Sequence, residues 1–442
     1  MKYVMPRPTN VSAQIIRSVT NPIREFMHLE SSSSVLLLLV TCLTLWWANS
    51  DYSNFYFDLL NLEIGFQLGL FHLVKSLQHW VNDGLMVIFF FVVGLEIKRE
   101  MTTGEITTFK KAAFPMFGAL GGVIVPALIY YSFNQSSLTA SGWAVPMATD
   151  IAFAVGILGL LGNRVPFALK IFLLTLAIVD DLVAVIVIAL FYTNELDLVS
   201  LSYSAAILLM IATLNYSGVR SRLVYVIFGV LFWFAVLKSG VHATIAGVAL
   251  GLLCPFRSLI PHQELKDSVS KLVHSSTETN SSETIEEMRL ILREAQSPLD
   301  QLVRTLHLWV AFFIMPLFAL FNAGVEFSLS KIPSLFSHPI GLGVVFGLLI
   351  GKPLGITLMA FISTRLKIAE LPQDVNWGHI VGVGALGGIG FTMALFIGNL
   401  SFVDNTPQLT VAKLSILVGS LLSAIAGMLI LFITSKRTPK NS

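Results

Sequence analysis

Charged residues are scarce in this chain. Lys, Arg, Asp and Glu make up 12% of its 442 residues, whereas a soluble protein carries about 25%. Hydrophobic residues account for 55% of the sequence. This composition excludes an ordinary soluble domain and predicts an integral protein of the lipid bilayer. The net charge is +2 and there is no basic tract, so no nucleic-acid partner is expected.

Cysteine is rare in this chain, and a glycine-rich ATP-binding loop is absent from its sequence. Only Cys42 and Cys254 could form a disulfide. The topology predicted below places them at opposite membrane faces, so no bridge is expected. The glycine-rich loop typical of ATP-binding proteins is missing, so ion gradients would have to drive any transport cycle. We expect no cofactor and no enzymatic activity.

Apolar stretches dominate the remainder of the chain, and about 20 apolar residues span a bilayer core. Twelve spans are predicted, at residues 35–48, 77–97, 112–131, 141–161, 169–192, 200–215, 222–237, 240–254, 306–325, 341–363, 377–398 and 410–434. The first span follows a basic segment but lacks a clean cleavage site, so it is interpreted as retained. Residues 1–442 are therefore predicted to form a single all-α, multi-pass transmembrane domain.

The positions of Lys and Arg predict the orientation of this domain. Of the 28 such residues, 23 fall in segments on the side of the N-terminus and 4 on the opposite side. In membrane proteins, short cytoplasmic loops carry more Lys and Arg than the loops on the other side. Both termini are therefore predicted to be cytoplasmic.

Two connecting segments are long. On the outer side, aromatic and β-branched residues in FYFDLLNLEIGFQLG predict a β-hairpin over 54–69. A lone hairpin is marginally stable in water, so it is expected to pair with a second copy. On the inner side, the loop over 255–305 has a polar centre and then an amphipathic helix near 284–296. A solvated linker and a regulatory element both remain possible for this loop.

Two adjacent carboxylates lie inside the fifth span. The stretch IFLLTLAIVDDLVAVIVIAL places Asp180 and Asp181 at its centre. One carboxylate at this depth costs roughly 2.5–3.5 kcal/mol on insertion scales, and two neighbours also repel each other. Ionisable groups in such places usually mark an ion pathway or a proton relay. We favour that interpretation over a protonated structural pair.

Three further features are predicted at the same depth. Lys352 lies about eleven residues from either end of the tenth span, too far to reach an interface, so it needs an anionic partner. Pro146, Thr149 and Asp150 predict an interrupted fourth span, with a simple kink capped by Asp150 as the alternative. Six glycines within 378–390 predict close helix crossing or a second interruption in the eleventh span.

The interrupted spans occupy corresponding places in two triplets, the third to fifth spans and the tenth to twelfth. The second triplet begins seven spans after the first. Because seven is an odd number, the two triplets enter the membrane from opposite sides. They are therefore predicted to be inverted repeats, with a transport site where the interrupted helices cross.

Several motifs resemble the NhaA family of bacterial sodium/proton antiporters, namely ATDIAFAVGIL, VDDL, GKPLGI, GLEIKRE, LKSGVHAT, FNAGV and GIGFTM. This family is itself a known example of the inverted-repeat arrangement. The resemblance implies twelve spans with crossed, interrupted fourth and eleventh helices. It also implies an inner-membrane homodimer, joined partly by the outer hairpin, that is activated at alkaline pH.

The resemblance also implies roles for individual residues. Asp180 and Asp181 would carry ions and protons, and Lys352 would be the family's buried lysine. Asp150 and Thr149 would compensate charge at the helix interruption. The loop over 255–305 departs most from the family pattern, close to where the family senses pH.

Asp83 and Glu96, at the two ends of the second span, correspond to family positions tied to cation passage. The predicted function is exchange of sodium, and also lithium, for protons, with Asp181 as the main ligand. Asp180 would alternate between Lys352 and the ion. Potassium/proton exchange, an intramembrane aspartyl protease and a cation channel are the alternatives.

Overall fold

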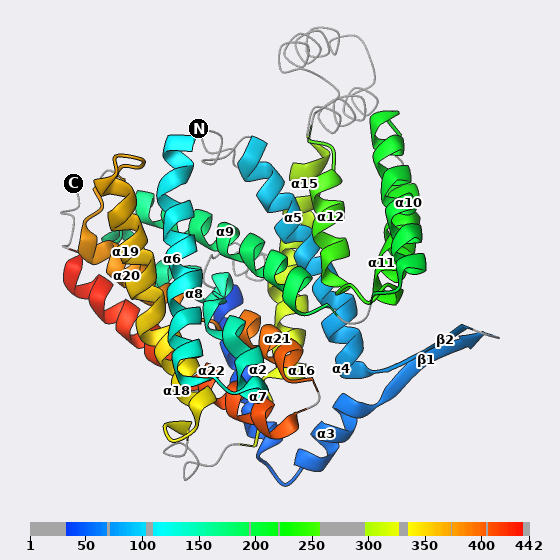
Figure 1. Ribbon diagram of the computed structural model, residues 1–442, viewed down its shortest axis with the longest axis horizontal. Helices are drawn as coiled ribbons and strands as arrows, with labels where there is room; N and C mark the ends of the chain where they lie inside the picture. Colours follow the sequence, from blue (N-terminus) through cyan, green and yellow to red (C-terminus); the bar gives the residue numbers. More distant parts are fainter. Residues whose placement is uncertain are drawn as a thin grey trace, which may run out of the picture.

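The computed structural model describes residues 32–68, 71–102, 109–193, 196–219, 222–256, 297–326, 335–372, 374–403 and 405–435. Within these residues, eight helices are long and apolar enough to cross a membrane, or ten if each of two bent helix pairs counts as one span. Leu223–Lys238 and Thr244–Leu253 are shorter apolar helices. The protein is therefore a mostly helical, multi-pass membrane protein (Figure 1).

The helices of the first half are α2 (Ser32–Ala48), α3 (Ser53–Asn61), α4 (Leu77–His79), the π-helix η1 (Trp80–Leu85), α5 (Met86–Thr102), α6 (Phe109–Phe133), α7 (Ser137–Ala140), the 3-10 helix η3 (Ser141–Met147), α8 (Ile151–Leu160), the 3-10 helix η4 (Gly162–Arg164), α9 (Phe167–Phe191), α10 (Leu198–Tyr216), α11 (Arg222–Lys238) and α12 (Thr244–Leu253). The second half contains α15 (Pro298–Trp309), the π-helix η5 (Val310–Ile314), α16 (Met315–Asn322), α18 (Pro339–Phe346), the π-helix η7 (Gly347–Gly351), α19 (Lys352–Arg365), α20 (Trp377–Gly387), α21 (Phe391–Ser401) and α22 (Thr406–Thr434). Two strands, β1 (Glu63–Leu68) and β2 (Phe71–Ser76), lie between α3 and α4.

The helices pack as two groups. In the first, called the core group, α6 packs on α9 and α19, and α22 packs on α18, α20 and α21. In the second, called the flanking group, α5 packs on α12 and α15, α10 packs on α11, and α2 packs on α16. The groups meet where α2 contacts α8, α5 contacts α9 and α16 contacts α21. Figure 1 shows α10 and α11 on the right, far from α6 and α19 on the left.

The closest contact within the core group joins α6 to α19. A Cβ atom placed on Gly121 would lie 2.0 Å from the Gly355 carbonyl oxygen, and one placed on Gly355 would lie 2.1 Å from the Gly121 carbonyl oxygen. Both atoms belong to the backbone and cannot move aside as a flexible side chain could. Only glycine therefore permits this helix separation.

Gly121→Ala is expected to lower the thermal unfolding midpoint of the protein in detergent. The added methyl group forces the two backbones apart, at a cost of about 1–3 kcal/mol. This exceeds the roughly 1 kcal/mol that alanine contributes to a helix. Gly229→Ala in α11 is the matched control, because its Cβ would meet only Leu250 Cδ1, at 3.5 Å. Equal midpoints for the two variants would contradict the expectation.

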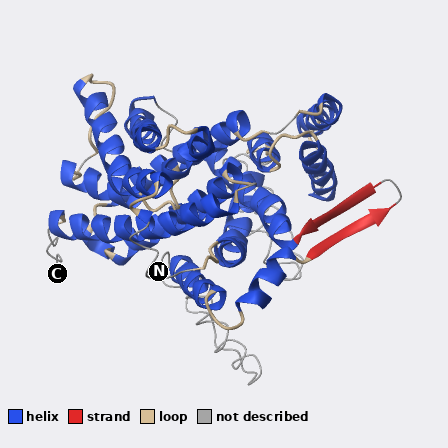
Figure 2. Ribbon diagram, turned by 60° about the horizontal axis from the view of Figure 1, so that its bottom comes forward, coloured by secondary structure: helices blue, strands red, loops and turns tan. Residues whose placement is uncertain are grey.

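The predicted hairpin over 54–69 is wrong in its first half. Residues 53–61 form α3, because Tyr56 and Leu60 recur at helical spacing and are buried. The Tyr56 hydroxyl donates to the Leu320 carbonyl oxygen at 2.8 Å. The antiparallel strands follow α3, with Glu63 opposite Ser76. Figure 2 shows both strands extending beyond the helices.

The loop predicted over 255–305 ends earlier than expected. Residue Pro298 begins α15, and the Ser297 hydroxyl accepts a hydrogen bond from the Asp300 backbone N–H at 3.5 Å. This capping arrangement explains why the helix starts well before the apolar run. The predicted amphipathic helix near 284–296 lies outside the described residues. Cys42 and Cys254 are not joined by a disulfide.

Candidate functional site

The fourth predicted span is interrupted near its middle. The 3-10 helix η3 ends at Met147, and the chain is extended at Ala148 (φ −71°, ψ 146°) and Asp150 (φ −91°, ψ 101°) before α8 begins. Pro146 lies in the last turn of η3 and has no backbone N–H to donate, which favours an ending there. The interruption therefore leaves backbone groups available to other segments.

The second interruption falls at residues 388–390, between α20 and α21, which are bent by 47° to each other. The earlier glycines of this span, including Gly382 and Gly384, are helical and buried. They serve close packing, since a Cβ on Gly384 would lie 2.8 Å from the Pro353 Cα. The break between α20 and α21 and the close packing of the glycines therefore fall in different parts of this span.

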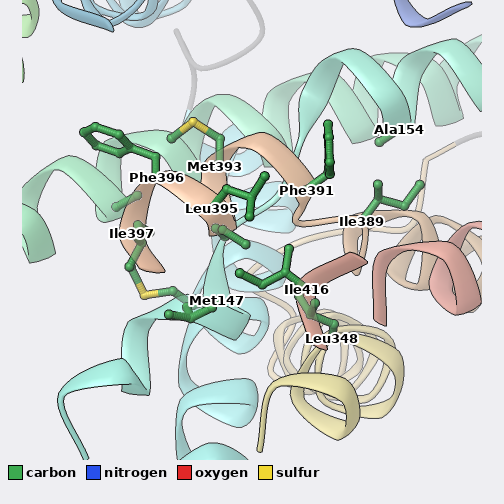
Figure 3. Close-up of a cluster of buried hydrophobic side chains, with 14 of the residues drawn as sticks. Met147, Ala154, Leu348, Ile389, Phe391, Met393, Leu395, Phe396, Ile397 and Ile416 are labelled. Carbon is green, nitrogen blue, oxygen red and sulfur yellow. The ribbon is translucent and has the colours of Figure 1, made fainter. Parts of the chain in front are cut away.

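The two interruptions contact each other directly. The Asp150 backbone N–H donates to the Ile389 carbonyl oxygen at 2.6 Å. Figure 3 shows the buried apolar side chains of this region, among them Ile389, Phe391, Leu348 and Ile416, which come from different parts of the chain. Apolar side chains thus surround the contact, and they keep its backbone polar groups away from solvent.

Asp150 accepts hydrogen bonds from the first turns of two helices. Its Oδ1 accepts from the Phe153 N–H of α8 at 3.1 Å, and its Oδ2 accepts from the Thr392 N–H of α21 at 3.0 Å. The Thr392 hydroxyl also donates to Oδ2. Asp150 is fully buried. Asp150 therefore caps the N-termini of both helices.

Lys352 forms an ion pair with Asp180, as its predicted need for an anion requires. Its Nζ donates to Asp180 Oδ2, and also to Thr149 Oγ1 at 2.8 Å. The exposed fractions are 0% for Lys352 and 3% for Asp180. Removing one partner from a buried pair leaves the other uncompensated, which costs about 3–5 kcal/mol. Loss of either partner alone is therefore expected to destabilise the protein.

Thr149 links this ion pair to the second interruption. Its Oγ1 lies 2.7 Å from Asp180 Oδ2 and 2.9 Å from the Gly387 carbonyl oxygen. A hydroxyl has one hydrogen to donate, so it can serve only one of these acceptors fully at a time. Thr149 therefore connects the Lys352–Asp180 pair to the Gly387 carbonyl group through a single hydroxyl.

The backbone before Lys352 is also irregular. The π-helix η7 ends at Gly351, and Pro353 follows Lys352 directly. Proline cannot donate the hydrogen bond that a regular helix needs at this point, and π-turns are frequent at functional sites. This local geometry fixes where the lysine enters the core group.

Two carboxylate oxygens at the site are buried and have no hydrogen-bond partner among the described residues. They are Asp180 Oδ1 and Asp181 Oδ2. Asp181 itself is only 2% exposed. A buried polar atom without a partner is costly, and oxygen ligands of this kind suit either a proton or a hard cation.

Asp83 and Glu96 do not join this cluster. Asp83 lies in η1 with its Oδ1 3.8 Å from His242 Nε2, and Glu96 lies in α5 with its Oε1 3.5 Å from His307 Nδ1. Both carboxylate side chains keep some solvent exposure, 28% and 16% respectively. The two residues therefore lie at opposite ends of one helical segment, each beside a histidine.

Three of these polar partners were not predicted from the sequence. Thr392 was contained in GIGFTM and His242 in LKSGVHAT, but neither was assigned a role. His307 lies outside the recognised motifs. Contacts across more than 200 residues, such as that between Thr392 and Asp150, leave no local signal in a single sequence.

Comparison with known proteins identifies the family. The family model described as Na+/H+ antiporter 1 matches residues 24–431. The chain is 43% identical to Na(+)/H(+) antiporter NhaA 2 of Psychromonas ingrahamii, over 96% of this chain and 92% of that protein. It is 44% identical to an NhaA antiporter of Oleidesulfovibrio alaskensis, over 95% of each chain. An NhaA antiporter of Helicobacter pylori is 45% identical over 94% of this chain and 96% of its own length.

A solved sodium proton antiporter from Methanocaldococcus jannaschii is more distant. It has a TM-score of 0.48 and 11% identity over 96% of both chains. The sequence relatives are far closer, and they cover nearly the whole chain. The chain therefore belongs to the Na+/H+ antiporter 1 family.

Proposed function

We propose that this protein is a secondary antiporter that exchanges sodium, and also lithium, for protons across the bacterial inner membrane, serving sodium and alkaline-pH homeostasis. The observation that carries the proposal is the pair of buried, unpartnered oxygens on Asp180 and Asp181, beside the ammonium of Lys352. The names of the relatives, which are Na(+)/H(+) antiporters, support it.

Competition at these oxygens is sufficient for exchange. A sodium ion prefers oxygen ligands and would occupy the same positions as the protons on Asp180 and Asp181. It would also compete with Lys352 for Asp180 Oδ2, so binding of the ion opens the ion pair. Asp181 is the main ligand in this scheme because it has no lysine partner to displace.

The proposed topology has twelve spans and two cytoplasmic termini. The eight long helices, the two bent pairs and the two shorter apolar helices together supply that number. The hydrogen bond between Asp150 and Ile389 supports a crossing of the interrupted fourth and eleventh spans, as inverted repeats would require. Asp83 and Glu96 then belong to the cation passage on the outer and inner sides of the site.

The alternatives fit the geometry less well. An intramembrane aspartyl protease uses two carboxylates that share a proton, commonly from two helices, whereas Asp180 and Asp181 are adjacent on α9. A channel selects with rings of charge around a pore, and a buried Lys352–Asp180 pair is not such a ring. Potassium/proton exchange differs only in the ion and is an outcome of the test below.

Everted membrane vesicles with a pH-sensitive dye test the function. Addition of Na⁺ or Li⁺ should move protons out of acidified vesicles at alkaline pH, with K⁺ added as the comparison. A scan over about pH 6.5–9 brackets the titration expected for a buried carboxylate. A dye signal with K⁺ alone would replace sodium by potassium as the substrate, and no cation-dependent signal would overturn the antiporter.

The hairpin is proposed to join two copies of the chain in a homodimer. Among the described residues the sheet has only two strands, β1 and β2, so each strand has one edge free for another strand. The Trp80 Nε1 donates to the Ile64 carbonyl oxygen at 2.8 Å and fixes the base of the hairpin. The projecting strands can therefore reach a second copy.

Replacing Gly65–Val74 by a two-residue Asn-Gly turn is expected to weaken dimerisation much more than transport. This deletion keeps α3 and the Ile64–Trp80 hydrogen bond, which a deletion of residues 54–69 would remove. The dimer fraction in mild detergent should fall severalfold, measured by size-exclusion chromatography with light scattering. Exchange in vesicles serves as the control. A dimer fraction equal to that of the wild type would show that the hairpin has another purpose.

A further inference from the structure

A cluster of amide side chains joins four helical elements, α4, η1, α16 and α21, on the predicted outer side of the site. At its centre is Asn322, the last residue of α16, which is fully buried. Its Nδ2 donates to Asn82 Oδ1 at 2.7 Å and to the Phe318 carbonyl oxygen at 2.9 Å. Its Oδ1 accepts from Asn399 Nδ2 at 2.7 Å and from Gln78 Nε2 at 3.4 Å. Every hydrogen-bonding position of this amide is used.

One of these hydrogen bonds crosses the boundary between the two helix groups. Asn322 belongs to the flanking group, on α16. Asn82 lies on η1, which packs on α5 and α16 of that group, and Gln78 lies on α4, which packs on η1. Asn399 belongs to α21, in the core group. The hydrogen bond between Asn322 and Asn399 therefore ties the far end of α21 to helices that belong to the other group.

The same end of α21 also carries the packing between the groups. One turn nearer the interruption, the Phe396 ring lies 5.7 Å from the Phe90 ring, 6.2 Å from Phe318 and 5.4 Å from His242, measured between ring centroids. His242 in turn lies beside Asp83. Asp181 is only 2% exposed in this conformation, so it is closed to the outer side, and both the Phe396 packing and the amide cluster lie on the predicted outer side of the site.

The π-helix η1 relates the cluster to the proposed cation passage. Asn82 and Asp83 are adjacent, yet Asn82 faces Asn322 while Asp83 faces His242. The wider π-turn is a common local device at functional sites. A shift of Asn322 would thus act on the same turn of backbone that holds Asp83.

We infer that the hydrogen bond between Asn322 and Asn399 is an outer clasp, which holds the two helix groups together while the outer passage is closed. It breaks each time Asp180 and Asp181 become accessible from outside. Asn322 and Asn399 are positioning residues, since they act by setting the place of α21 and do not bind the ion. This inference rests on the antiporter function proposed above.

Asn399→Ala tests the clasp through the sidedness of transport. Loss of the hydrogen bond raises the population of the outward-open state about fivefold, the ratio that matches a typical net hydrogen bond. The KM for Na⁺ at the outer face, measured in right-side-out vesicles, should fall by about fivefold. The KM at the inner face, measured in everted vesicles, should change much less, because the closed state remains the major one. Asn322 keeps Gln78 as a donor, which favours folding of the variant.

Asn134→Ala is the matched control. Asn134 is also a buried amide, and it donates to the Pro339 carbonyl oxygen at 2.9 Å, but both residues lie within the core group. Its loss should lower stability without altering the ratio of the two KM values. Equal changes of KM at both faces in Asn399→Ala, with active wild-type protein, would overturn the clasp alone. Absence of exchange in the wild type would instead overturn the antiporter.

A cross-link tests the same inference by holding the two positions together. Asn322→Cys and Asn399→Cys are combined with Cys42→Ser and Cys254→Ser, so that only the new pair can be oxidised. Formation of the disulfide should stop exchange, and reduction should restore it. Full exchange by protein whose cross-link is verified by mass spectrometry would show that the contact need not open, and would overturn the clasp.

Discussion

Asp181→Asn is expected to reduce sodium-driven proton movement to the level of vesicles without the protein, while the variant still folds and inserts. Asparagine keeps the shape of the side chain but loses the charge and the titrating proton. Asp181 Oδ2 has no partner among the described residues, so the substitution breaks no ion pair. Burial of a neutral amide also costs less than burial of a carboxylate, so the unfolding midpoint should not fall.

Asp197→Asn is the control for this experiment. Asp197 caps α10 and accepts from the Val199 and Ser200 N–H groups and from the Ser200 hydroxyl. The Ser200 hydroxyl holds the pKa of this carboxyl below its usual range. Asparagine caps a helix about as well, so exchange should be retained. Wild-type sodium exchange by purified Asp181→Asn would refute the role assigned to Asp181.

Lys352→Ala is expected to destabilise the protein, and a compensating second substitution should restore much of the loss. Without the ammonium, Asp180 remains buried, and among the described residues only the Thr149 hydroxyl still donates to its Oδ2. An ionised Asp180 would then cost about 3–5 kcal/mol. Uptake of a proton would avoid that cost, and sodium would have to displace the proton. The unfolding midpoint should therefore fall, and exchange should require a higher pH.

The double variant Asp180→Asn with Lys352→Gln distinguishes loss of the whole ion pair from loss of one partner. No unpaired charge remains, so the midpoint should recover most of what Lys352→Ala loses. Residual exchange through Asp181 alone should move fewer charges per cycle, which a current measurement on solid-supported membranes can detect. A double variant no more stable than the weaker single variant would show that the two side chains are not energetically coupled.

The sequence predicted the polar centre of the site because charge in an apolar span has few explanations. Asp180, Asp181 and Lys352 each interrupt a long apolar run. Pairing of Lys352 with an anion follows from the cost of burial alone. The contacts of Asp150 with Thr392 could not be predicted, because they depend on how two distant interruptions meet.

Local pattern was less reliable outside the membrane spans. The segment 54–61 resembles a strand by composition, yet Tyr56 and Leu60 face one side of a helix. Burial of Tyr56 against α16 decides between the two, and that contact is tertiary. The start of α15 at Pro298 was missed for a different reason, since a capping serine and a proline, and not hydrophobicity, determine it.

Asp150 has a consequence for how such a chain could have arisen. One carboxylate from the first half of the chain serves the N-termini of α8 and of α21, which belong to different halves. A polypeptide that contained only the second half would present α21 with an uncompensated N-terminus in a dry interior. The second half of such a chain therefore depends on the first, and a chain of half the length would need a neighbouring copy to supply that carboxylate.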